Sequence, residues 1–71
     1  MAMRSTDRLR AAEEVVARLR GALGEAGVIL PSLRVDPVTA ASDVACPLVD
    51  LGRCNLDMAM RIVAVLHEAR R

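Results

Sequence analysis

The sequence predicts an α+β fold: a small α-β-β-α domain in which two flanking helices cover a two-stranded antiparallel sheet. Three observations predict it. Apolar residues recur at helical spacing near the N-terminus, a strand followed by a glycine occupies residues 47–52, and a capped apolar segment covers residues 56–69. With 71 residues the chain has room for a single domain, 1–71, and we expect residues 1–5 to be disordered.

A first helix is predicted from Ser5 or Thr6, either of which is a suitable N-terminal cap, to about Ala26. Gly24 or Gly27 suits the position after the helix, because glycine adopts the left-handed conformation at little cost. Apolar side chains recur along this segment at alternating spacings of three and four residues, which is typical of a helical seam packed against a neighbour. They are Leu9, Ala12, Val16, Leu19, Leu23 and Ala26.

The middle of the chain predicts two short strands joined by a helical turn. Leu33–Asp36 alternates apolar and charged side chains, as a half-buried strand does. Asp36 and Pro37 then favour a short helix over Val38–Ser42, with the aspartate as cap and the proline at the first position. The second strand is predicted over Cys46–Leu51.

The last helix is predicted over Leu56–Ala69, after Gly52 ends the strand and Asn55 caps the helix. Its polar side chains form one narrow stripe, so apolar side chains cover most of its circumference. A domain of this size cannot easily cover so much apolar surface by itself. A two-stranded sheet alone is also only marginally stable in water. We therefore expect a homodimer that shares a helical seam or a sheet edge. The expected interface comprises Leu9, Ala12, Val16, Leu19, Leu23, Met58, Ile62 and Val65.

The composition disfavours several classes of function. The chain has no aromatic residue, so it lacks the side chains on which nucleic-acid bases and flat cofactors usually stack. Its net charge of +1 gives no field to attract DNA or an anionic membrane, and no apolar run reaches the roughly 18 residues of a membrane span. We expect neither a nucleic-acid nor a membrane partner.

The cysteines and the N-terminal segment indicate a cytoplasmic, reduced protein. Two cysteines make no disulfide framework, and the first residues lack the apolar core of a signal peptide. All ten basic residues are arginine, which favours a GC-rich coding source such as a high-GC bacterium.

No set of residues predicts catalysis, a metal or a cofactor. Cys54 beside Arg53 at a helix start has the surroundings that activate a thiol. The only histidine, His67, follows near the far end of the same helix, roughly 18 Å away, so the two cannot meet within one chain. The spacing of Cys46, Cys54 and His67 also matches no closed metal site. We expect a protein that is not an enzyme.

Two functions remain open from the sequence. The first is a small interaction or regulatory module that acts through an apolar helix face, with a second copy as partner and a larger protein as a further one. The alternative is a small-molecule or anion-binding domain that uses the turn from Gly52 to Asn55. In that case Arg53 clamps the anion, and Asn55 stands at the helix N-terminus, where backbone N–H groups point outwards.

Overall fold

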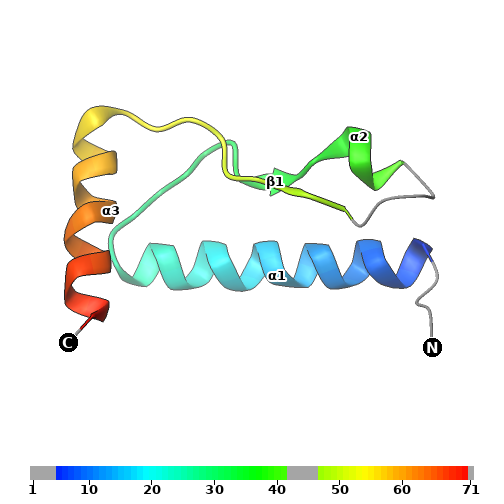
Figure 1. Cartoon of the computed structure of the whole chain (residues 1–71), viewed down its shortest axis with the longest axis horizontal. Coiled ribbons are helices and arrows are strands. Elements are labelled where there is room, and N and C mark those ends of the chain that lie inside the picture. The colour runs from blue at the N-terminus through cyan, green and yellow to red at the C-terminus, as the bar shows by residue number, and fades with distance from the viewer. Residues whose placement is uncertain (1–4, 42–46, 71) are drawn as a thin grey trace.

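A computed structural model of the chain describes residues 5–41 and 47–70. These residues form three helices and a two-stranded antiparallel sheet, so the α+β class predicted from the sequence is confirmed. Ser5 already belongs to the first helix, and the other residues for which disorder is expected lie outside the described part. The elements in chain order are α1 (Ser5–Glu25), β1 (Arg34–Val35), α2 (Pro37–Ala40), β2 (Val49–Asp50) and α3 (Leu56–Ala69) (Figure 1).

The C-terminal end of α1 is a sharp reversal centred on Gly27. Gly27 has a φ of +81°, in the left-handed region, and its N–H donates to the carbonyl of Gly24 at 3.0 Å. The Val28 N–H donates to the Leu23 carbonyl at 2.7 Å. Together these two bonds form a Schellman motif, which satisfies helix carbonyls that would otherwise lack donors. Of the two glycines predicted to end the helix, Gly27 is therefore the one that does, and Val28 is buried directly after it.

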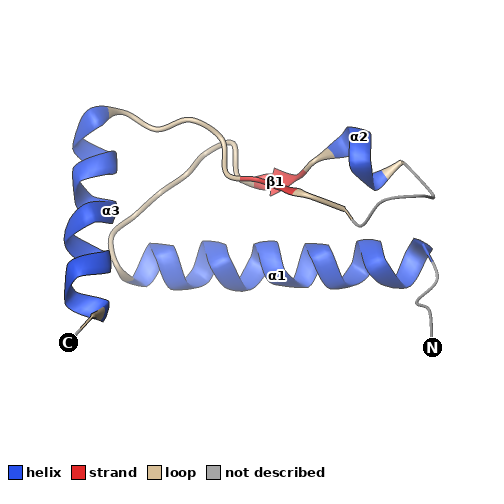
Figure 2. Ribbon diagram, in the orientation of Figure 1, coloured by secondary structure: helices blue, strands red, loops and turns tan. Residues whose placement is uncertain are grey.

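The hairpin lies alongside α1 (Figure 2) and is shorter than predicted. In β1 and β2, Arg34 stands opposite Asp50, and Val35 stands opposite Val49. Before β1 the next ladder bond would join the Gly52 N–H to the Ser32 carbonyl, but the Gly52 N–H donates to the Asp50 carboxylate at 2.9 Å instead. After β1 the ladder ends at Asp36, since Pro37 has no N–H to donate. The predicted strands Leu33–Asp36 and Cys46–Leu51 were therefore too long, and Cys46 itself lies outside the described residues.

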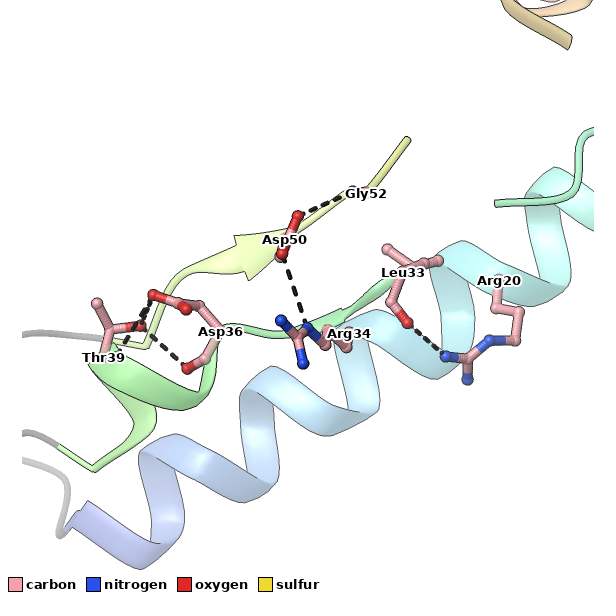
Figure 3. Close-up of polar contacts among 7 residues, drawn as sticks. All are labelled: Arg20, Leu33, Arg34, Asp36, Thr39, Asp50 and Gly52. Atoms are coloured by element: carbon pink, nitrogen blue, oxygen red, sulfur yellow. Dashed lines mark hydrogen bonds and ion pairs between the residues drawn. The ribbon is translucent and has the colours of Figure 1, made fainter. Parts of the chain in front are cut away.

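The short helix α2 is capped as predicted and is tied to the second strand. Asp36 has an extended backbone, and its carboxylate accepts from the backbone N–H of Thr39 at 3.4 Å. The Thr39 hydroxyl lies 3.1 Å from the same carboxylate oxygen (Figure 3). It also accepts from the Leu48 N–H at 2.9 Å. One threonine thus joins the cap of α2 to the chain that enters β2. The helix begins at Pro37, one residue before the predicted Val38, and ends at Ala40, while Ser42 lies outside the described residues.

The final helix, α3, has the predicted bounds and the predicted cap. The Asn55 side-chain oxygen accepts from the Met58 N–H at 2.8 Å. Figure 1 shows α3 running across the C-terminal end of α1. Two contacts attach it there: the Ile29 N–H donates to the Met58 sulfur at 3.4 Å, and the Arg61 guanidinium lies beside Gly27. A cation in this position interacts favourably with the partial negative charge at the C-terminus of α1.

The buried core of the described residues is very small. It consists of Val16 from α1, Val28 from the reversal after α1, and Leu33 from the residue before β1. Arg20 fastens α1 to the same region by donating from its guanidinium to the Leu33 carbonyl at 2.9 Å (Figure 3). The core therefore lies between α1 and the segment that follows it, and α3 contributes no buried side chain to it.

Gly52 is the glycine on which the hairpin depends most closely. It has a φ of +79°, and a Cβ added there would lie 2.6 Å from Ser32 Cβ and 3.0 Å from the Ser32 carbonyl carbon. We expect Gly52→Ala to lower the free energy of unfolding by at least about 1–2 kcal/mol, because backbone strain and a steric clash add. Denaturation by urea, followed by circular dichroism at fixed protein concentration, measures the change.

Gly21→Ala is the matched control for this substitution. Gly21 lies within α1, and an added Cβ would meet no atom within 4 Å. Alanine is the better helix former, so this variant is expected to gain roughly 0.5–1 kcal/mol. Equal stability of Gly52→Ala and the unsubstituted chain would contradict the account of the turn.

Candidate interaction surface

The apolar side chains of α3 divide into two rows with different exposure. The row that is half-buried against the rest of the chain comprises Met58, Ile62 and Val65. The second row, which we call the outer face, comprises Leu56, Met60, Val63 and Leu66, with exposed fractions of 85%, 66%, 44% and 59%. Because the spacings in this row are four, three and three residues, its members lie on one side of the helix.

The outer face is exposed because the chain meets α3 from the other side. In Figure 1 all other described elements lie on one side of this helix. At 100° per residue, Asp57, Arg61 and Glu68 form a separate narrow stripe, whereas His67 and Arg70 lie on the side of the outer face at its C-terminal end. The outer face is therefore an apolar strip whose C-terminal end is polar. Such a strip marks a contact surface more often than a solvated one.

A shallow hollow lies at the C-terminal end of the outer face. Its volume is about 150 Å³, and its lining comprises Val63, Leu66, His67 and Arg70. These residues are spaced i, i+3, i+4 and i+7, so they surround one point on the helix surface. Leu56, the most exposed of the large apolar side chains, lies at the opposite end of the same face.

The apolar seam predicted on α1 is used mainly within the chain. Val16 is buried, and Leu9, Ala12, Leu19 and Leu23 are half-buried. The same side of α1 packs on β1 and on the segment that leads to it. Val16 therefore has no surface to offer a second copy in this structure, and a dimer contact by its half-buried neighbours stays a prediction.

The turn before α3 brings Arg53 and Asn55 to one hollow, as the alternative function requires. The hollow has a volume of about 410 Å³ and is lined by Ile29, Pro31, Arg53, Cys54, Asn55 and Met58. The oxygen of the Asn55 carboxamide is already bonded to the Met58 N–H, and Asp57 places a negative charge in the first helical turn. Both observations suit capping better than capture of an anion, since Asp57 competes for the same partial positive charge.

Of the groups considered for catalysis or metal binding, Cys54 and His67 lie at opposite ends of α3, and Cys46 lies outside the described residues. Cys54 is an exposed free thiol at the start of α3, and His67 lies in its last turn. Among residues 5–41 and 47–70, no group of three or more His, Cys, Asp or Glu side chains is placed to hold a metal ion.

The interface predicted from the sequence uses the half-buried row of α3, whereas the structure exposes the outer face. Met58, Ile62 and Val65 recur at the same helical spacing as the outer face, so periodicity alone does not say which row meets the chain. The distinction depends on where the segment before α3 attaches. The residues that the sequence-based list omits are Leu56, Met60, Val63 and Leu66.

No helix in the described residues combines the length and the apolar character that crossing a bilayer requires. Comparison of the chain with protein-family models, with curated proteins and with solved structures finds no match. The case for a function therefore comes from the geometry and exposure of the chain's own residues.

Proposed function

We propose that the protein is a small non-catalytic interaction or regulatory module that works as a homodimer through the outer face of α3. The observation that carries the proposal is the exposure of Leu56, Met60, Val63 and Leu66 along one side of a single helix. Val16, Val28 and Leu33 form the buried core of the described residues, so the apolar strip of the outer face lies outside that core. Burial of this strip against a partner removes apolar area from water, which is the main favourable term in protein association.

The accessible surface and the radius of gyration of the chain are both larger than those of a compact monomer of its size. The chain exposes 5854 Å², whereas a compact monomer of its mass exposes about 4,300 Å². Its radius of gyration is 14.2 Å, against about 11 Å for a compact chain of 71 residues. The chain is thus less compact than a typical monomer of its size, as expected of a fold that leaves apolar surface uncovered.

The free thiol supports a reducing setting for this module. Cys54 is exposed, and an exposed free thiol is kept reduced in the cytoplasm but is open to oxidation outside the cell. We accordingly place the proposed homodimer in the cytoplasm.

Replacement of Met60 by lysine tests the proposed surface. The substitution keeps a good helix former but puts a charge in the centre of the outer face. Desolvation of that charge on association is costly, so we expect the dissociation constant of the homodimer to rise at least tenfold. Sedimentation equilibrium over a range of micromolar concentrations measures the constant.

Ala64→Lys provides the matched control. Ala64 is exposed on the same helix but on the side of the polar stripe, so a lysine there should leave the dissociation constant within about twofold. An unsubstituted chain that is monomeric throughout the concentration range would overturn the proposal. If Met60→Lys and Ala64→Lys changed the dissociation constant equally, the outer face would not be the dimer interface.

The alternative function, anion binding at the turn from Gly52 to Asn55, has its own test. We expect inorganic phosphate to leave the amide signals of Leu56 and Asp57 unshifted in NMR spectra. The reason is that Asn55 already accepts from a backbone N–H of the first turn and Asp57 already places a negative charge there. Phosphate-dependent shifts that disappear in Arg53→Ala would instead establish the alternative.

A further inference from the structure

The outer face of α3 carries a projection at one end and a matching recess at the other. Leu56 projects at the N-terminal end, with 85% of its surface exposed. The recess at the C-terminal end is the hollow of about 150 Å³ between Val63, Leu66, His67 and Arg70. In packed helix pairs, one side chain inserts between four residues of the facing helix that have this i, i+3, i+4, i+7 arrangement.

Resting on the proposed homodimer, we infer that two copies pair their α3 helices antiparallel, with Leu56 of each copy seated in the hollow of the other. Projection and recess lie at opposite ends of one helix, so each meets its counterpart only when the two helices run in opposite directions. In a parallel pair, the two Leu56 side chains would meet each other and both hollows would stay empty.

The same register gives the centre of the helix pair a packed arrangement. With Leu56 opposite the midpoint of residues 63–70, the two-fold axis passes near residue 61. Met60 then lies level with Val63 of the other copy, within the exposed outer face, and the small Ala59 beside them leaves room for the flexible methionine side chain.

The helix dipoles also favour the antiparallel pair, because the positive N-terminal end of each α3 lies beside the negative C-terminal end of the other. The same register brings Arg53 of one copy level with Arg70 of the other, so the side-chain charges at the helix ends add nothing in its favour.

The test is an NMR measurement on the unsubstituted protein. Within one copy, Leu56 and His67 are eleven residues apart on a helix, or roughly 16 Å, which is beyond the range of a nuclear Overhauser effect. The antiparallel pair brings the Leu56 methyl groups of one copy against the His67 ring of the other. We expect an intermolecular cross-peak between them in an isotope-filtered spectrum of mixed labelled and unlabelled protein, and we expect its loss in Met60→Lys.

Cysteine pairing provides a second test in chains whose own Cys46 and Cys54 are replaced by serine. We expect Leu56→Cys and His67→Cys chains, mixed and mildly oxidised, to form the mixed disulfide. Neither variant is expected to form a disulfide with itself, because like positions lie on the order of 16 Å apart along the axis.

The outcomes separate this inference from the proposed function. A dimer that gives no contact between Leu56 and His67, or in which Leu56→Cys pairs with itself, overturns the antiparallel arrangement and leaves the homodimer standing. A monomer in sedimentation overturns both.

Discussion

The reversal after α1 is the constraint on which the rest of the structure depends. The left-handed backbone at Gly27 turns the chain back, and the bond from the Val28 N–H to the Leu23 carbonyl fixes the direction in which it leaves. Val28 is thereby buried beside α1, and the chain then runs back along that helix to bring Leu33 onto the same side. The attachment of α3 uses the same place, since Arg61 lies beside Gly27 and Met58 accepts from the Ile29 N–H.

Short-range signals in the sequence account for most of the element boundaries. Asp36 before Pro37 and Asn55 before Leu56 are caps whose side chains bond the backbone three residues on, so local chemistry alone predicts them. The strand lengths were not predictable in the same way. They depend on the bond from the Gly52 N–H to the Asp50 carboxylate and on Pro37, and periodicity does not report where the ladder ends. The exposed row of α3 was missed for a related reason, because it is decided by a tertiary attachment and not by spacing.

Hydrogen bonds and an ion pair join elements that the small apolar core does not hold together. Asp50 accepts from the Gly52 N–H at 2.9 Å and lies 3.7 Å from Arg34 across the hairpin (Figure 3). Thr39 connects α2 to Leu48. The Arg34–Asp50 ion pair is largely exposed, so it contributes at most about 1 kcal/mol. In the proposed homodimer folding and association would be coupled: a partner that binds only the folded state raises its stability, so the midpoint of unfolding would rise with protein concentration.

The placement of Leu56 and the hollow near His67 on a single helix face also limits how far assembly proceeds. Where projection and recess lie on different sides of a molecule, each added copy exposes a new end, and the contact propagates into a filament. On one helix face, a two-fold pair uses both projections and both recesses at once. In the proposed pair, growth would therefore stop at two chains, and the apolar strip that is open in the monomer would be closed without a second type of subunit.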